Sequence, residues 1–168
     1  MGKVMIILGS ASDRAKMEPA IWALTNKAEV EAHVVSAHRT PEELRKIIID
    51  SDADVFIAGA GMAAALPGVI AALTPRPVIG VPLSGSFMSG LDALFSIAQM
   101  PKGVPVATVA VDGAENAAIL ALEILGIKEQ KAEDAIYALR EDLRRDTIEK
   151  DRLFIEHVNN RRKEFLKD

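Results

Sequence analysis

The chain has 168 residues, 49% of them hydrophobic and only 4% aromatic, so it is long enough for one domain whose core is built from aliphatic side chains. The formal net charge of -4 gives no electrostatic reason to expect nucleic acid or an anionic membrane as a partner. No cysteine is present, which excludes disulfides, thiol catalysis and cysteine-based zinc sites, and three scattered histidines argue against a histidine-based metal site.

An apolar run of strand length is followed by a helical spacing five times along residues 3–126. These five β-then-α units predict an α/β fold of the flavodoxin-like, three-layer αβα type, with a five-stranded parallel sheet and helices on both faces. The expected strands are 3–8, 30–36, 54–58, 77–81 and 104–110. The expected helices end near Lys27, Ser51, Leu73, Gln99 and Leu125. We assign 1–128 to this domain and 129–168 to a C-terminal helical extension of the same domain.

The first βα turn, Gly9–Asp13, combines a glycine, the hydroxyls of Ser10 and Ser12 and the start of a helix. Free backbone N–H groups and the helix dipole favour an anion at such a position, so the turn is a candidate phosphate site. The alternative is simple capping, in which Ser12 or Asp13 bonds the first helical turn and does nothing more.

The second turn, Ser36–Pro41, carries a histidine beside an arginine where an expected strand meets an expected helix. Thr40 is the expected N-cap of that helix, with Pro41 at its first position. Ligands of open α/β sheets bind at the carboxyl ends of the strands. There, His38 can exchange a proton near neutral pH, and Arg39 has a permanent charge suited to phosphate. A solvated loop is the alternative.

Two further turns fall at the same edge of the expected sheet. Residues 59–68 are rich in glycine and alanine, so their backbone amides can approach a carboxylate or a flat ring. Tight packing against the neighbouring strand explains the same composition. Residues 82–90 carry three serines among flexible residues, which predicts a mobile flap or, alternatively, an ordinary surface loop.

Only one of the three histidines is placed for proton transfer. His33 lies inside an expected strand, where a structural role is favoured. His157 lies among the charged residues of the C-terminal extension, which predicts a surface position. His38 is therefore the candidate proton carrier.

The C-terminal extension is rich in charges of both signs and keeps apolar residues at helical spacing without glycine or proline. A single helix of about 36 residues would be about 54 Å long. A compact domain of this size has a radius of gyration of only about 15 Å. We therefore expect either a break near 146–151 or packing on another subunit. We favour oligomer contacts over a solvated helix, because Phe154, Val158 and Phe165 otherwise lack a core to enter.

Several longer motifs follow one another in the turns and strands. They are Gly9-Ser10-x-Ser12-Asp13, Ser36-Ala37-His38-Arg39-Thr40-Pro41, Ala58-Gly59-Ala60-Gly61 with Leu66-Pro67-Gly68, Gly80-Val81-Pro82, Ser89-Gly90-Leu91-Asp92-Ala93-Leu94, Gln99-Met100-Pro101-x-Gly103-Val104-Pro105-Val106-Ala107-Thr108-Val109-Ala110 and Asn116-Ala117-Ala118. In this order they resemble the PurE family of purine biosynthesis, and the resemblance runs from about residue 3 to 126.

The resemblance implies an enzyme that acts on aminoimidazole ribonucleotides without metal or organic cofactor and that assembles as a homo-octamer. By motif position, the first turn and Arg39 would hold the ribose phosphate, with Asp13 suited to ribose hydroxyls. Ser36 and the backbone of 59–63 would line the base and carboxylate, and His38 would be catalytic. The expected substrate-binding set is Gly9, Ser10, Ser12, Asp13, Ser36, Ala37, Arg39, Gly59, Ala60, Gly61, Ala63 and Leu66.

The bacterial form of this family is a mutase, which moves a carboxylate from the exocyclic nitrogen of N5-carboxyaminoimidazole ribonucleotide to ring carbon C4. A carbamate loses CO2 once its nitrogen is protonated, and C4 must lose a proton after it has attacked the CO2. One group that is first an acid and then a base can perform both steps if its pKa lies near the working pH. His38 alone qualifies without a large shift.

Two residues depart from the mutase pattern: Met62 and Ala65 stand where a glycine and a histidine are usual. Animal-type relatives, which carboxylate aminoimidazole ribonucleotide directly with CO2, also lack that histidine, and residues 84–87 look somewhat like theirs. The mutase-like features are Arg39, Thr40-Pro41, Leu66-Pro67-Gly68 and the run from Gln99 to Ala110. We favour the mutase, with the direct carboxylase as the alternative.

A non-enzymatic flavodoxin-like module is the remote alternative. A signalling receiver needs an acidic residue at the end of the third strand, where Ala58-Gly59 stands, and a flavin site usually needs aromatic side chains, of which these turns offer only Phe87. The expected partners are the ribonucleotide, CO2 and other copies of the chain. No apolar run reaches the ~20 residues of a membrane helix, so we expect no membrane partner and a cytoplasmic location.

Overall fold

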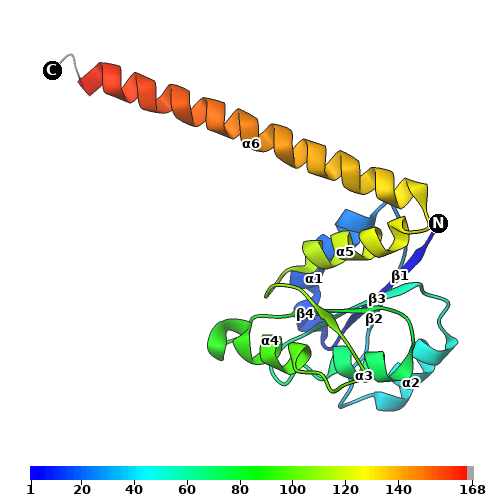
Figure 1. Ribbon diagram of the computed structural model, residues 1–168. Helices are drawn as coiled ribbons and strands as arrows, with labels where there is room; N and C mark the ends of the chain where they lie inside the picture. The colour runs from blue at the N-terminus through cyan, green and yellow to red at the C-terminus, as the bar shows by residue number, and fades with distance from the viewer. Residues whose placement is uncertain (166–168) are drawn as a thin grey trace.

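The computed structural model describes residues 1–165 and has a five-stranded sheet at its centre (Figure 1). The strands pair in parallel in the order β2-β1-β3-β4-β5. They are β1 (Lys3–Leu8), β2 (Glu29–Val34), β3 (Val55–Ala60), β4 (Val78–Pro82) and β5 (Ala107–Thr108). This arrangement confirms the predicted flavodoxin-like α/β fold, and it brings the carboxyl ends of all strands to one edge.

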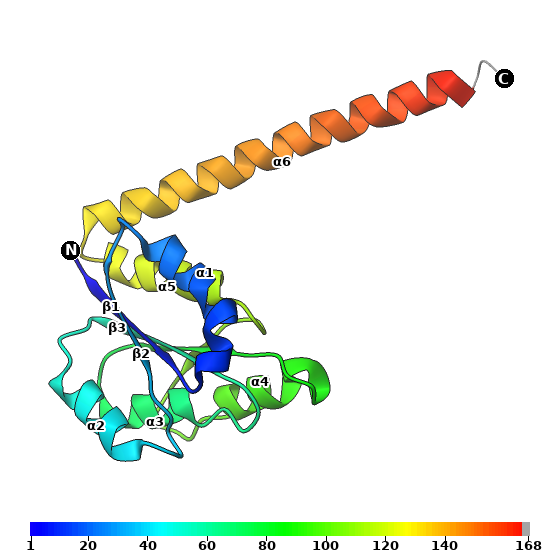
Figure 2. The same ribbon diagram turned by 180° about the vertical axis from the view of Figure 1, so that it is seen from behind.

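Helices cover both faces of the sheet, as seen from behind in Figure 2. One face carries α1 (Arg14–Leu24) and α5 (Ala114–Gly126), and the other carries α2 (Pro41–Asp50), α3 (Leu66–Leu73) and α4 (Leu91–Ala98). Short 3-10 turns, η1 (Ala11–Asp13) and η2 (Met88–Gly90), precede α1 and α4. The final helix, α6 (Gln130–Phe165), follows α5.

The core is built from small and branched aliphatic side chains on both faces of β1. Val4 and Ile6 pack under α1 and α5, while Met5 and Ile7 pack under the other three helices. All four are at most 1% exposed, and burial of each stabilises the fold by roughly 1.5–3 kcal/mol. No polar or charged residue among those described is buried, so the core is held by apolar packing alone.

Several predicted boundaries are wrong, among them the end of the second strand, which stops at Val34 rather than at residue 36. The first helix ends at Leu24 rather than Lys27, because the backbone leaves the helical conformation at Thr25, where ψ is 130°, and Asn26 then has a φ of 65°. The third strand runs on through Ala60, two residues past its expected end. The fifth strand shrinks to Ala107–Thr108, because Pro105 has no N–H to donate to a sheet neighbour.

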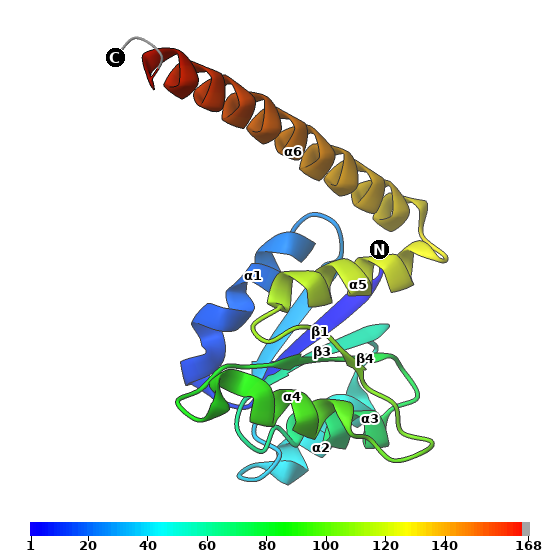
Figure 3. The same ribbon diagram turned by 60° about the vertical axis from the view of Figure 1, so that its left-hand side comes forward.

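As far as the structure describes it, the C-terminal extension is one continuous helix, Gln130–Phe165, which excludes the first of the two alternatives, a break near 146–151. Helix α6 packs on α5 only through its first turns, where Ala132 and Ile136 are buried and Arg140 pairs with Glu123 at 2.6 Å. Figure 3 shows α6 leaving the domain beside α5. No helix within residues 1–165 is both long enough and apolar enough to cross a membrane.

Beyond Glu141, the side chains of α6 that the structure describes are all exposed. Ion pairs three or four residues apart line this stretch, including Arg145 with Glu141 and Lys150 with Asp146. Such pairs support a solvated helix modestly. The helix continues because nothing in its sequence stops it, although it has no domain beneath it.

Candidate active site

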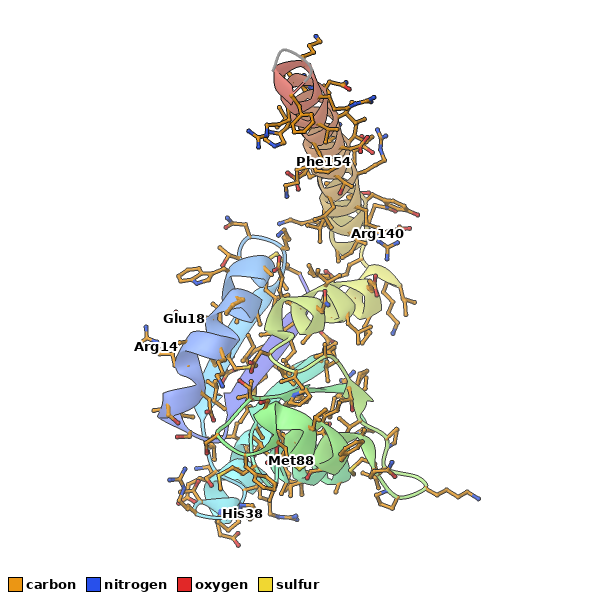
Figure 4. The ribbon with its side chains drawn as sticks, turned by 90° about the vertical axis from the view of Figure 1, so that its left-hand side faces the viewer. Arg14, Glu18, His38, Met88, Arg140 and Phe154 are labelled. Carbon is orange, nitrogen blue, oxygen red and sulfur yellow. The ribbon has the colours of Figure 1, made fainter. Side chains whose placement is uncertain are left out.

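Four turns meet at the carboxyl ends of the strands and enclose a cleft of about 680 Å³. The cleft is bounded by the turns after β1, β2, β3 and β4, the same four turns that the sequence singled out. It lies at the end of the domain away from α6, where Figure 4 labels His38 far from Phe154.

The first turn is organised by serine hydroxyls. Ser10 precedes η1, and its Oγ accepts a hydrogen bond from the backbone N–H of Ser12 at 3.3 Å. The two hydroxyl oxygens of Ser10 and Ser12 lie 2.8 Å apart, and Ser12 donates to Asp13 Oδ1 at 3.5 Å. Ser10 thus caps only the short turn η1, while Asp13, at the N-cap of α1, makes no capping bond with its side chain, so the simple capping considered for Ser12 or Asp13 does not occur. The polar groups of the turn remain at the surface of the cleft.

The second turn is fixed by one residue bonding across it. Thr40 precedes α2 as predicted, but its hydroxyl does not cap the helix. The hydroxyl instead accepts from the N–H of Ser36 at 3.0 Å and donates to the Ser36 carbonyl oxygen at 3.2 Å. Ser36 Oγ accepts from the N–H of Arg39 at 3.3 Å. This closed pattern presents the side chains between Ser36 and Thr40 to the cleft.

Arg39 and His38 use that turn differently. The Arg39 guanidinium donates to the carbonyl oxygen of Gly9 at 3.0 Å, which ties the second turn to the first. Arg39 lines the cleft and is exposed, so its remaining N–H groups are accessible to an anion. Within residues 1–165, the exposed imidazole of His38 has no hydrogen-bond or ion-pair partner. It is therefore free to meet a ligand.

The third turn begins later than expected, because Gly59 and Ala60 belong to β3. Gly59 faces the core: an added Cβ there would lie 2.6 Å from Met17 Sδ. Its carbonyl oxygen accepts from the N–H of Gly9 at 3.2 Å. Gly59 therefore supports the cleft from beneath without lining it. Met62 and Ala64 adopt positive φ values of 56° and 39°, which turns the chain sharply along the cleft wall.

The fourth turn forms one side of the cleft through Ser84, Gly85, Ser86 and Phe87. The Phe87 side chain is 67% exposed. Asp112, from the turn before α5, accepts from the N–H and hydroxyl of Ser84 at 2.9 and 2.5 Å. Partial burial by itself would raise the pKa of Asp112, but these hydrogen bonds and the charge of Lys16 outweigh it and hold that pKa below its usual value.

The structure brings together every sequence-predicted site residue except Gly59. It adds cleft residues that were outside the predicted set: Met62, Ala64, Ala65, Ser84, Gly85, Ser86, Phe87 and Asp92. Residues 84–87 could have been included from the sequence, because they lie in the serine-rich loop of 82–90 that was predicted to be a flap. Asp92 could have been found as the acidic residue in the first turn of α4. No cluster of three His, Asp or Glu side chains suited to a metal ion occurs among the described residues.

The other histidines lie elsewhere. His33 borders a separate hollow of about 540 Å³ at the edge of the sheet, and its Nε2 lies 2.7 Å from Glu31 Oε1. Glu31 also pairs with Lys3 at 2.8 Å, so His33 belongs to a surface ion-pair network, as the structural interpretation predicted. His157 is exposed on α6, which confirms its predicted surface position.

Comparison with known proteins identifies the family. The family profile described as AIR carboxylase matches residues 3–146. The chain belongs to the AIR carboxylase family. A relative from Pyrococcus abyssi, named N5-carboxyaminoimidazole ribonucleotide mutase, is 52% identical over 149 residues, covering 86% of this chain and 86% of the relative. A relative of the same name from Saccharolobus solfataricus is 50% identical over 152 residues, which cover 88% of this chain and 96% of the relative.

A solved structure agrees with this assignment to the AIR carboxylase family. The crystal structure of Treponema denticola PurE matches with a TM-score of 0.82 and 27% sequence identity, over 90% of this chain and 97% of that one. The motif resemblance to PurE is therefore confirmed. The AIR carboxylase profile includes all four turns of the cleft and ends at Asp146, so the outer part of α6 lies beyond the matched residues.

Proposed function

We propose that this chain is an N5-carboxyaminoimidazole ribonucleotide mutase of purine biosynthesis. The observation that carries the proposal is the identity of about half the residues, over most of the length, with two relatives of that name. The cleft supports it, because a free histidine and an arginine share one rigid turn beside a serine-rich helix start. The substrate is phosphorylated and charged, so we expect the reaction in the cytoplasm, where such a substrate is retained.

Substrate binding is assigned to the first two turns. We place the ribose phosphate at the start of α1, where the hydroxyls of Ser10 and Ser12, the first free N–H groups and the Arg39 guanidinium converge. Asp13 accepts hydrogen bonds from ribose hydroxyls. Ser36, Ala37 and the backbone of 60–63 line the base and its carboxylate. In this assignment the phosphate end is cationic and the base end is built from small residues.

The reaction needs a proton to leave and to return to one group. His38 as imidazolium donates a proton to the exocyclic nitrogen as the bond from that nitrogen to the carboxyl carbon breaks, and CO2 is released. The enamine-like C4 then attacks the CO2 carbon and forms the new bond between carbons. Neutral His38 takes the C4 proton, which restores the aromatic ring and the starting imidazolium. The net change is an isomerisation, with no external oxidant or reductant.

Retention of CO2 is assigned to the wall formed by Ala60, Gly61 and Ala63 to Leu66. Ala60, Ala64 and Leu66 are each at most 6% exposed, whereas Ala63 is exposed at the surface of the cleft, so the wall is apolar and its base is closely packed. CO2 is small and has no net charge, so a dry pocket of small side chains holds it without binding it tightly. Ala65 stands in this wall, where the mutase pattern usually has a histidine.

We further propose that copies of the chain assemble through α6, as a homo-octamer. The outer part of the helix carries large apolar side chains at 37–66% exposure with nothing to cover them within one chain: Leu143, Ile148, Leu153, Phe154, Ile155 and Val158. Burial of these residues against another copy removes them from water. A monomer in sedimentation at micromolar concentration would contradict the assembly, and a different subunit number would contradict the octamer.

The test of function supplies the purified protein with N5-carboxyaminoimidazole ribonucleotide and, separately, with aminoimidazole ribonucleotide plus bicarbonate. We expect efficient conversion of the carbamate to the C4-carboxylated product without added CO2, after subtraction of spontaneous breakdown. Conversion of the decarboxylated nucleotide alone, rising with CO2, would instead establish the direct carboxylase.

His38→Asn tests the proton carrier. We expect kcat to fall by about 10²–10⁴-fold while the substrate still binds, because only proton transfer is removed. Binding is measured by calorimetry with the C4-carboxylated product. Wild-type turnover in this variant would remove His38 from the mechanism.

A further inference from the structure

Lys16, in the first turn of α1, reaches across the end of the sheet to Ser84, at the start of the loop that follows β4. Its Nζ donates to the carbonyl oxygen of Ser84 and to Ser84 Oγ, the latter at 2.7 Å. It also lies 3.8 Å from Asp112 Oδ1. The N–H and hydroxyl of Ser84 are bonded to the Asp112 carboxylate. All polar atoms of Ser84 are thus engaged by one Lys–Asp pair.

The last residue of the fourth turn, Gly90, lies against its first polar residue, Ser84. An added Cβ on Gly90 would lie 3.0 Å from Ser84 Cα and 2.6 Å from Val111 Cγ1, so the backbone at Gly90 passes directly against Ser84. Gly90 has a φ of 92°, which only glycine adopts easily. Residues 85–89 therefore form a loop that is closed by the contact between Ser84 and Gly90. From here on we call residues 85–89, the exposed part of the predicted flap of 82–90, the flap, and the Ser84–Gly90 contact its neck.

The flap has little support beyond this neck. Each of its residues is exposed, and its backbone hydrogen bonds are made only with the residues that follow it: the Gly90 N–H donates to the Phe87 carbonyl oxygen at 3.5 Å and the Leu91 N–H to the Met88 carbonyl oxygen. Gly85, Ser86 and Phe87 line the cleft on the side facing the first two turns. The angle at which the flap stands over the cleft is consequently set at the neck.

We propose that Lys16 is a positioning residue which, with Asp112, holds the neck at Ser84 so that the flap covers the reacting ribonucleotide and retains CO2. The role in CO2 retention rests on the proposed mutase function. Lys16 belongs to the helix whose first residues follow the phosphate-binding turn, so one rigid element connects the phosphate end of the cleft with the flap. Asp112 belongs to the turn before α5, which anchors the pair to a second helix.

The geometry explains why a charged pair is used here. The side chains of Lys16 and Asp112 are 36% and 39% exposed, so neither charge is fully removed from water. Hydrogen bonds to charged groups are stronger than those between neutral groups, and a partly hydrated pair avoids most of the desolvation penalty of a buried one. A neck held in this way stays in place while the flap tip moves with the ligand.

Lys16→Met is the test variant, Asp112→Asn removes the opposite charge, and Lys46→Met is the matched control, an exposed lysine on α2. The first measurement needs no substrate: chymotryptic cleavage after Phe87, followed by mass spectrometry of the fragments. We expect the rate to rise about 10-fold in Lys16→Met and Asp112→Asn, because a released neck opens the local segment, and to stay unchanged in Lys46→Met. Lys16→Arg is expected to restore most of the protection, since its guanidinium also donates two hydrogen bonds.

The second measurement is the fraction of N5-carboxyaminoimidazole ribonucleotide that leaves the enzyme as the decarboxylated nucleotide. We expect this fraction and KM to rise in both neck variants, with kcat/KM falling about 10–100-fold, as small misplacements at a reacting centre do. The double variant is expected to be no worse than either single one, because both act at Ser84.

Three outcomes would overturn the inference. If cleavage after Phe87 is the same in Lys16→Met and Lys46→Met, the neck does not depend on Lys16. Altered kinetics without altered cleavage would place Lys16 in direct contact with the ligand. Faster cleavage with an unchanged fraction of decarboxylated product would show that the flap does not retain CO2. An inactive wild-type protein would overturn the mutase function, while the cleavage measurement would still test the neck.

Discussion

The sheet domain is stabilised by a buried apolar core, whereas the outer part of α6 is stabilised by ion pairs along an exposed helix. In the domain, buried aliphatic side chains such as Ile6 and Ile57 are 0% exposed, and no described polar residue is buried. In α6 beyond Glu141, every described side chain is exposed, and ion pairs between neighbouring turns accompany apolar residues that enter no core. The domain has a filled core within one chain, although it too exposes apolar residues such as Trp22 and Phe95, whereas the outer part of α6 has no core at all and the surface of a helix that needs a partner.

Removal of the outer part of α6 should have the largest effect, because it should abolish assembly while leaving the stability of the sheet domain unchanged. A chain ending after Asp142 keeps the contacts of Ala132, Ile136 and Arg140 with α5 but loses the exposed apolar residues. We expect complete loss of assembly, measured by light scattering after size exclusion. The unfolding free energy of the isolated protomer should change by less than about 0.5 kcal/mol, as for other changes at exposed positions. An unchanged assembly mass would refute the contact through α6.

A matched pair of isoleucine substitutions gives the next largest effect. Ile57→Ala in β3 removes a fully buried side chain, and we expect it to lower the unfolding free energy by about 2–5 kcal/mol. Ile148→Ala in α6, where the side chain is 55% exposed, should lower it by less than about 0.5 kcal/mol in the isolated protomer while weakening assembly. Urea denaturation of dilute protein measures both changes in unfolding free energy. Equal changes in the two variants would contradict the difference between the core and α6.

Acid should affect α6 before the sheet core. Hydrogen bonds from Arg144 and then Arg145 lower the pKa of Glu141 from its ordinary value of 4.5 to about 2. Because the folded pKa is the lower one, this stabilisation is present above pH 4.5 and is lost as the pH falls from 4.5 toward 2. Circular dichroism at 222 nm should show a loss of helix in that range, smaller in Glu141→Gln than in wild type. Identical acid titrations of the two proteins would contradict the prediction.

The smallest expected effect concerns the join between the two regions. Arg140→Ala removes the 2.6 Å pair with Glu123 on α5, an exposed contact worth about 0.2–1 kcal/mol. The unfolding temperature of the variant should therefore be slightly lower than that of the wild type. High salt should make this difference disappear, because it screens the Arg140–Glu123 pair in the wild type. A loss comparable to that of Ile57→Ala would mean that α6 supports the domain more than its exposure suggests.

Much of the fold and the site could be predicted because the signals are local. The strand of Lys3–Leu8 follows from a continuous apolar run, and the turn of His38 follows from a strand end beside a helix start. The break in α6, one of the two alternatives, does not occur, because residues 130–165 contain no glycine or proline and a helix need not turn back onto its own domain. Gly59 was placed in a turn because small residues suit a turn and a crowded strand equally, and only Met17 decides between them.

The bonds at the flap neck could not be predicted from the sequence. Lys16, Ser84 and Asp112 lie on three segments separated by 68 and 28 positions, and nothing in the composition of any one segment indicates the other two. Local patterns specify elements and turns. Contacts between distant polar side chains depend on how those elements are finally packed.

The Ser36–Thr40 bonds have a consequence for protein design. The hydrogen bonds that close the backbone of the turn of His38 and Arg39 lie within five consecutive residues, and only the Arg39 side chain bonds outside them, to Gly9. Such a turn is portable: grafted between a strand and a helix of another parallel sheet, the segment brings its own scaffold with it. The flap is not portable, since its neck needs a lysine and an aspartate from two other parts of the host.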